Sequence, residues 1–232
     1  MTQADHRGAQ AAATAGIHRI SRLGMVNAYL VAEDDGLTLI DTGLAGAHRL
    51  ILARARGLGL PIRRIALTHA HRDHRGSLDT LAAALPGAQV IVSEREAPLL
   101  AGDTTTRPTR LVRDGDAIGS LRVIATPGHT PGHVAFLDSR DGTLYAGDAY
   151  TTTWGVATSA VVPWHYPMAG LATWNRDLDL ASARLLRDLG PDRLASGHGP
   201  VISAPGPAMT RAIEAAARKI ERLPPAAPRE DR

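Results

Sequence analysis

The sequence lacks cysteine altogether, which excludes disulfide bonds, thiolate metal ligands and cysteine nucleophiles. It also lacks any apolar run close to the roughly 20 residues that a membrane-spanning helix needs. The first residues show neither the basic start nor the apolar stretch of a secretion signal. We therefore predict a protein of the reducing cytoplasm that has no membrane partner.

An excess of charge of one sign is also missing, because the formal net charge is only +3 over 232 residues. The basic side chains are nearly all arginine and are spread along the chain, whereas nucleic-acid-binding proteins usually cluster them and interleave aromatic residues. Hydrophobic residues make up 44% of the chain, which is the balance of an ordinary globular domain. We expect a small-molecule substrate and no nucleic-acid partner, and we leave open a homodimer.

Short apolar runs separated by turn residues predict strands that alternate with helices. Two strand-rich halves, each with its own helices, indicate an α/β protein with two packed sheets and helices outside. We predict a single domain over residues 17–223, with disordered tails at 1–16 and 224–232. The predicted strands are 26–31, 37–40, 62–67, 90–92, 121–125, 134–137, 143–146 and 193–195, and the predicted helices are 45–58, 77–85, 170–189 and 207–223.

The helix predicted over 170–189 is amphipathic, because its apolar residues recur at spacings of three and four. We take these residues as the face that it buries against the sheet: Leu171, Trp174, Leu178, Ala181, Leu185 and Leu189.

A dense histidine and aspartate motif, THAHRDH at residues 68–74, directly follows the strand 62–67. His69 and His71 are two residues apart and point the same way in an extended chain, so both can meet one ion. Chance would produce an H-x-H-x-D-H pattern in such a chain with a probability of about 10⁻³. Imidazole and carboxylate groups suit zinc and related divalent ions. Further candidate ligands end apolar runs beside glycines, where a sheet places functional side chains: His129, Asp148 and His198.

The motifs HAHRDH, TPGHT, AGD and SGHG, in that order, resemble the metal-binding motifs of the metallo-β-lactamase superfamily, and LIDTG at 39–43 resembles its early signature. The resemblance implies the metallo-β-lactamase fold, an αββα sandwich of two mixed sheets packed face to face. It also implies that Asp41 orients the ligands without touching metal. Two divalent ions are implied, with zinc expected and iron or manganese as alternatives. The first would be held by His69, His71 and His129, the second by Asp73, His74 and His198, and Asp148 would bridge them.

A hydroxide held between two divalent ions is available at neutral pH, because metal binding lowers the pKa of water from 15.7 towards about 7. Such a hydroxide would attack a carbonyl carbon, and Asp73 would accept its hydrogen bond. We predict a hydrolase of lactones, esters or thioesters. A hydroxyacylglutathione hydrolase is disfavoured, because only a short segment follows His198.

Other activities of the fold stay open as alternatives: β-lactamase, phosphodiesterase and non-catalytic binding. A further alternative is a persulfide dioxygenase, which would bind one iron through His69, His129 and Asp148.

Aromatic residues are few, yet several of them gather in the segment after Asp148. We predict that this segment lines the site and contacts substrate through Tyr150, Trp154, Trp164, His165 and Tyr166. The alternative is that the rings only anchor an irregular loop. The Tyr150 hydroxyl is predicted to donate to a substrate oxygen, because related lactonases carry a tyrosine one residue further on. His133, the second histidine of TPGHTPGH, is predicted to have a hydrogen-bonding role and no metal.

Overall fold

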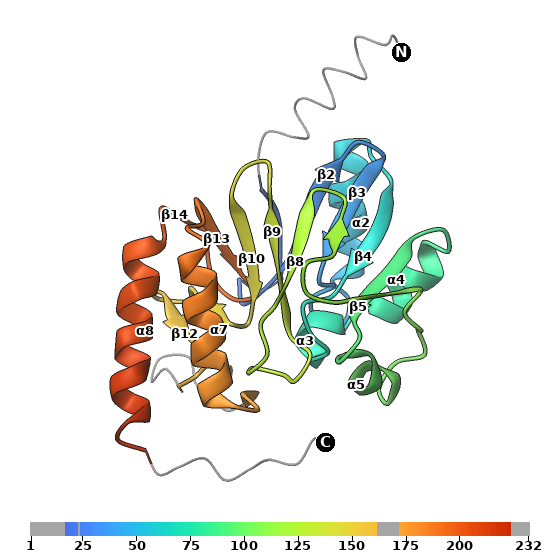
Figure 1. The fold of residues 1–232 in the computed structure, drawn as a ribbon. Helices are drawn as coiled ribbons and strands as arrows, with labels where there is room; N and C mark the ends of the chain where they lie inside the picture. Colours follow the sequence, from blue (N-terminus) through green and yellow to red (C-terminus); the bar gives the residue numbers. More distant parts are fainter. Residues whose placement is uncertain (1–16, 23, 162–171, 224–232) are drawn as a thin grey trace.

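The computed structural model describes residues 17–22, 24–161 and 172–223, and Figure 1 shows two sheets packed face to face between helices. The first sheet has the strand order β1-β2-β3-β4-β5-β6 and the second β14-β13-β10-β9-β8-β7. The strands of the first sheet are β1 (His18–Arg22), β2 (Val26–Glu33), β3 (Gly36–Ile40), β4 (Ile62–Ala66), β5 (Gln89–Ser93) and β6 (Arg110–Val112). Those of the second are β7 (Ala117–Ile118), β8 (Leu121–Ala125), β9 (Val134–Asp138), β10 (Thr143–Gly147), β13 (Arg193–Ser196) and β14 (Ile202–Ser203).

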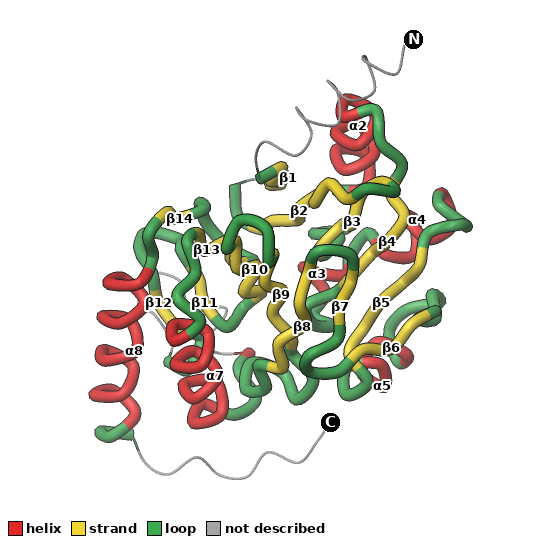
Figure 2. Tube along the Cα trace, turned by 45° about the horizontal axis from the view of Figure 1, so that its top comes forward, coloured by secondary structure: helices red, strands yellow, loops and turns green. Residues whose placement is uncertain are grey.

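The helices lie on the outer faces of the two sheets, and the view in Figure 2 keeps the two groups on opposite sides. The helices beside the first sheet are α2 (His48–Leu58), α4 (Leu78–Ala84) and α5 (Ala97–Ala101), and those beside the second are α7 (Arg176–Asp188) and α8 (Gly206–Ile220). A single turn, α3 (Arg72–Arg75), and a small hairpin of β11 (Tyr150–Thr151) and β12 (Ala157–Thr158) complete the described elements.

Side-chain alternation along the strands divides the core into layers. On β2, Ala28 and Leu30 pack under the outer helices, whereas Tyr29 faces the opposite sheet. The rings of Tyr29 and Tyr145 meet edge to face between the sheets, with centroids 5.2 Å apart. The predicted αββα sandwich is confirmed by these layers.

The strand directions bring several loops to one edge of the sandwich. In the first sheet β3, β4 and β5 are parallel. In the second, β8 and β10 are both antiparallel to β9, and β13 is parallel to β10, so β8, β10 and β13 run in the same direction. The segments that follow β3, β4, β8, β10 and β13 carry the predicted ligands, and they converge at the carboxyl ends of these strands.

The buried face predicted for the helix 170–189 is wrong at Leu178, Ala181 and Leu185, which are exposed. Leu189 packs partly buried against the core, and Leu171 lies outside the described residues. The helix begins at Arg176, because the Asn175 side chain caps it by accepting from the N–H groups of Asp177 and Leu178. Leu178 and Leu185 are 40% and 46% exposed. The apolar spacing is satisfied by more than one stripe of this helix, and packing against α8 and the second sheet selects the stripe with Leu180, Ala183 and Leu186.

Trp174 was predicted to lie on that helix, but it precedes the helix and is only partly buried. The edge strands β1, β6, β7 and β14 and the hairpin β11–β12 were not predicted either. Most of these segments are two or three residues long, so their pairing comes from the neighbouring strand and leaves no periodicity in the sequence.

Replacing Leu186 with alanine should lower the free energy of unfolding by about 2–5 kcal/mol, because the side chain is fully buried and leaves a cavity. The adjacent Leu185→Ala is the matched control and should change stability by only about 0.5 kcal/mol. Urea denaturation of both variants measures the difference. A larger loss for Leu185→Ala would show that the originally predicted face is the buried one.

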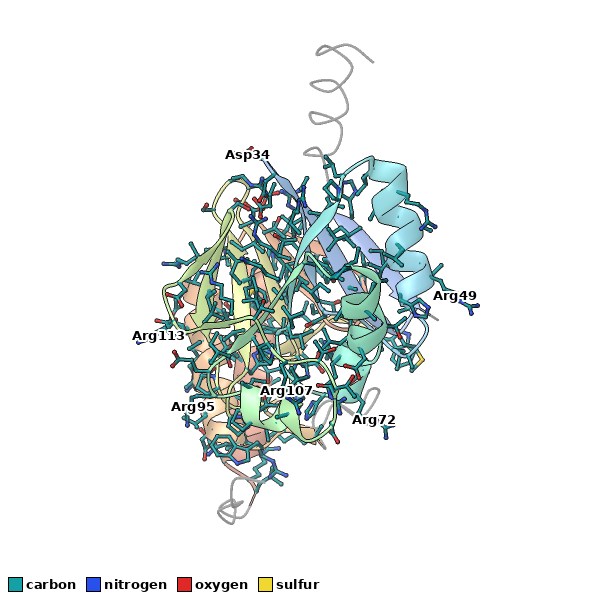
Figure 3. The ribbon with its side chains drawn as sticks, turned by 90° about the vertical axis from the view of Figure 1, so that its right-hand side faces the viewer. Asp34, Arg49, Arg72, Arg95, Arg107 and Arg113 are labelled. Atoms are coloured by element: carbon teal, nitrogen blue, oxygen red, sulfur yellow. The ribbon has the colours of Figure 1, made fainter. Side chains whose placement is uncertain are left out.

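Among the described residues, no helix is long and apolar enough to cross a membrane. The tails predicted at 1–16 and 224–232 lie outside the described residues. Figure 3 shows one face of the molecule, on which the labelled arginines come from separate segments of the chain and are spread apart.

Candidate metal centre

All seven predicted ligands meet at the edge where the parallel strands end. Three groups of side chains have ligand atoms within 4.8 Å of one another: His69, His71 and His129; His69, His74 and Asp148; and Asp73, His74 and His198. We call the first of these the first cluster and the last the second cluster. Zinc bonds of 2.0–2.2 Å in a tetrahedron place ligand atoms roughly 3.3 Å apart, so both clusters have the size of a metal site.

The first cluster presents imidazole nitrogens to a common centre. Nδ1 of His71 lies 3.0 Å from Nε2 of His129. The far nitrogens of the other rings are occupied by hydroxyls, since Nδ1 of His69 lies 3.0 Å from Thr68 Oγ1 and Nδ1 of His129 lies 3.2 Å from Thr173 Oγ1. Because Thr173 also donates to the Ser159 carbonyl, its oxygen is left to accept from His129, which keeps Nε2 available for an ion.

Asp148 lies between the two clusters. Its Oδ1 is 3.2 Å from Nε2 of His74, and its Oδ2 is 3.1 Å from Nε2 of His198 and 3.6 Å from Nε2 of His129. One carboxylate therefore reaches ligands of both clusters, as a bridging ligand would. In the second cluster, Oδ2 of Asp73 lies 3.4 Å from Nε2 of His198.

The two clusters differ in charge when no metal is bound. Burial lowers the pKa of the His69 and His129 imidazoles well below the usual value, so they stay neutral. Burial also lowers the pKa of His198, but the Asp148 carboxylate raises it, to about 9 overall. For Asp73 burial raises the pKa, whereas its hydrogen bond with His198 lowers it to about 2. A divalent cation in the second cluster would replace the proton on His198, and binding there would release it.

A second layer of side chains holds the ligands in place. Oδ2 of Asp41 lies 2.8 Å from Nδ1 of His74, and the other oxygen accepts from the Thr68 backbone N–H at 2.8 Å. Asp41 has a φ of 57°, which aspartate tolerates better than most residues. Nδ1 of His198 lies 2.8 Å from the Met25 carbonyl. Thr173 was missed in the sequence, because an isolated threonine carries no periodic or motif signal. Thr68 opens the THAHRDH motif, but no role was assigned to it.

Buried polar atoms without hydrogen-bond partners also indicate that the site binds divalent cations. Three buried ligand atoms have no hydrogen-bond partner among the described residues: His69 Nε2, His74 Nε2 and Asp148 Oδ1. Buried polar atoms are rarely left unsatisfied, because this costs about 1–3 kcal/mol each. All three belong to predicted ligands, and His74 Nε2 and Asp148 Oδ1 face each other at 3.2 Å, so a cation shared by these ligands would satisfy them.

A family model described as the metallo-beta-lactamase superfamily matches residues 21–198. The chain belongs to the metallo-beta-lactamase superfamily. The uncharacterized protein YobT of Bacillus subtilis (strain 168) is 45% identical in an alignment of 210 residues that covers 82% of this chain and 90% of YobT. A hydroxyacylglutathione hydrolase of Gloeobacter violaceus is 32% identical over 136 residues, but these cover 57% of this chain and only 52% of that enzyme. The structure of TTHA1623 in a di-iron-bound form matches with a TM-score of 0.63 and 29% identity over 82% of this chain and 96% of that one.

Membership of the metallo-beta-lactamase superfamily and the His/Asp clusters together support a metal-dependent hydrolase. His133 contacts the backbone next to the metal centre and supplies no ligand atom to either cluster. Its Nε2 accepts from the Asp148 backbone N–H at 3.1 Å, and its Nδ1 lies 2.7 Å from Thr126 Oγ1. Both ring nitrogens are therefore engaged, and burial lowers the pKa of His133 to about 3.

The role predicted for Tyr150 needs correction. Its side chain is fully buried, and its hydroxyl donates to the Ala183 carbonyl in α7 at 2.7 Å. The side chain extends from β11 to α7, so the hydroxyl is not available to a substrate. Trp154 is 77% exposed and lies at a left-handed φ of 55°. The other predicted substrate contacts, Trp164, His165 and Tyr166, lie outside the described residues.

The substitution Tyr150→Phe should therefore lower the free energy of unfolding and leave kcat unchanged. It removes one buried hydrogen bond to the Ala183 carbonyl, which keeps its helical partner in α7, and should cost about 0.5–1.5 kcal/mol of unfolding free energy. Thermal denaturation and steady-state kinetics on one substrate measure both effects. A tenfold lower kcat with unchanged stability would restore the catalytic role predicted from the sequence.

Proposed function

We propose that the chain is a dinuclear metal-dependent hydrolase that cleaves a carboxylic ester, lactone or thioester. The observation that carries this proposal is the pair of clusters joined by one carboxylate, in which three ligand atoms are buried without a hydrogen-bond partner among the described residues. Bound divalent ions would polarise the scissile carbonyl and supply a water acidic enough to attack at neutral pH. Zinc is the proposed ion, and iron is the main alternative because TTHA1623 was solved in a di-iron-bound form.

The side chains of the site divide the remaining work. Asp73 is the most open of the acidic ligands, with 35% of its side chain exposed, so its carboxylate can accept a hydrogen bond from the attacking water. Asp41 holds the ring of His74 through Nδ1, and His133 holds the backbone of Asp148. These contacts keep the ligand geometry preorganised.

A substrate panel tests the proposal. Protein loaded separately with zinc, manganese or iron is assayed on lactones, esters, thioesters, β-lactams and phosphodiesters, with His71→Ala as the matched control. We expect turnover of at least one acyl substrate and its loss in the control. Activity confined to phosphodiesters or β-lactams would overturn the assignment to esters, lactones or thioesters. Oxygen uptake with a persulfide would favour the mononuclear iron alternative.

A further inference from the structure

Glu96 is a buried acidic residue that no ligand motif contains. It lies in the turn between β5 and α5, and its side chain is 1% exposed. The neighbouring Arg95 is exposed and reaches the edge of the molecule in Figure 3. A buried carboxylate is costly unless it is well hydrogen-bonded, so its partners indicate its role.

Each partner of the Glu96 carboxylate belongs to a loop that carries first-cluster ligands. Oε1 accepts from the backbone N–H of Ala70, the residue between His69 and His71, at 2.8 Å. Oε2 accepts from Thr130 Oγ1 at 2.9 Å and from the Gly132 N–H at 3.0 Å. Thr130 follows His129 directly. One carboxylate thus joins the HAH loop after β4 to the TPGHT loop after β8.

The surrounding packing leaves this connection little freedom. A Cβ on Gly132 would lie 2.4 Å from the Glu96 backbone nitrogen, so the turn and the loop are in direct contact. The Ala70 carbonyl is also held, because Arg75 Nε donates a hydrogen bond to it. The Arg75 guanidinium is fixed in turn by an ion pair with Asp103. Ala70, the residue between His69 and His71, is therefore held at both its N–H and its C=O, so both of its peptide groups are oriented.

We propose that Glu96 is a positioning residue of the first cluster, which sets the spacing between the His69–His71 pair and His129 and thereby the metal affinity of that cluster. This inference rests on the proposed metal-dependent function. Outer contacts of this kind typically change metal affinity by about 10–100-fold. The second cluster has no contact with Glu96 among the described hydrogen bonds, so its affinity should be unaffected.

The variant Glu96→Gln tests the inference, because an amide offers one acceptor oxygen in place of two and cannot satisfy both loops. The matched control is Glu94→Gln in the same turn, whose side chain is 46% exposed and, among the described residues, pairs with the exposed Arg113 alone. Zinc affinity is measured for each equivalent by competition with a chromophoric chelator, together with the visible spectrum of cobalt-loaded protein and the melting temperature of metal-free protein. We expect one equivalent to weaken by about 10–100-fold in Glu96→Gln and neither in Glu94→Gln.

Wild-type affinity for both equivalents and an unchanged cobalt spectrum in Glu96→Gln would overturn the role of Glu96. If that variant does not fold, Thr130→Val decides, because it removes one of the three donors and should weaken the same equivalent by a smaller factor. Unchanged affinity there would equally overturn the inference. A wild-type chain that binds no metal would instead refute the proposed function itself.

Discussion

Replacing His129 with alanine should lower the metal content from about two ions per chain to about one, because it removes a ligand of the first cluster. Hydrolysis of the best panel substrate should fall on the order of 10³-fold, since Lewis-acid stabilisation of the transition state is worth several kcal/mol. Metal analysis by mass spectrometry and kinetics measure both effects. A strong chelator should abolish wild-type activity, and zinc should restore it.

His133→Ala is the matched control, four residues along the same loop. It leaves the Asp148 N–H without its acceptor and should cost about 1–3 kcal/mol of stability. Metal content should stay at the wild-type value, because both nitrogens of His133 are engaged by protein groups. Loss of an ion from His133→Ala but not from His129→Ala would reverse the assignment of the two histidines. Full activity of metal-free protein would refute the mechanism.

Gly197→Ala should impair metal binding and catalysis nearly as severely as His129→Ala, although it removes no ligand. A Cβ at this position would lie 2.3 Å from Asp148 Oδ1 and 2.4 Å from His74 Cε1, so these ligands would have to move. Displacements of about 1 Å at a reacting centre cost on the order of 10²-fold in rate. We expect a loss of that order in kcat/KM and a weaker affinity for at least one ion, measured by steady-state kinetics and chelator competition.

Gly57→Ala provides the control for adding a methyl group. Gly57 lies within α2, and no atom lies within 4 Å of the added Cβ. The substitution should raise the unfolding free energy by about 0.5–1 kcal/mol, because alanine favours helix over glycine, and leave metal affinity unchanged. Wild-type activity and metal content in Gly197→Ala would show that Asp148 and His74 do not pack against Gly197.

The ligand residues could be predicted from the sequence because their information is local. The HAHRDH motif concentrates histidine and aspartate in one short segment after a strand, and His129, Asp148 and His198 each follow an apolar run beside glycine. The sandwich could be predicted for a similar reason, since strand and helix periodicities are properties of neighbouring residues. The longer strands accordingly agree with the structure to within a residue or two.

Other features depend on which segments pack together, and the tertiary structure alone decided them. The apolar spacing of α7 allows two stripes, and the buried one was selected by α8 and the second sheet. Tyr150 resembles a substrate contact by its position after Asp148, yet its hydroxyl meets the Ala183 carbonyl of a helix 33 positions further on. Glu96 and Thr173 acquire their roles through loops distant in sequence. A hydrogen-bond partner is fixed by geometry in space, whereas a ligand motif follows strand geometry over a few residues, so only the motif is visible in the sequence.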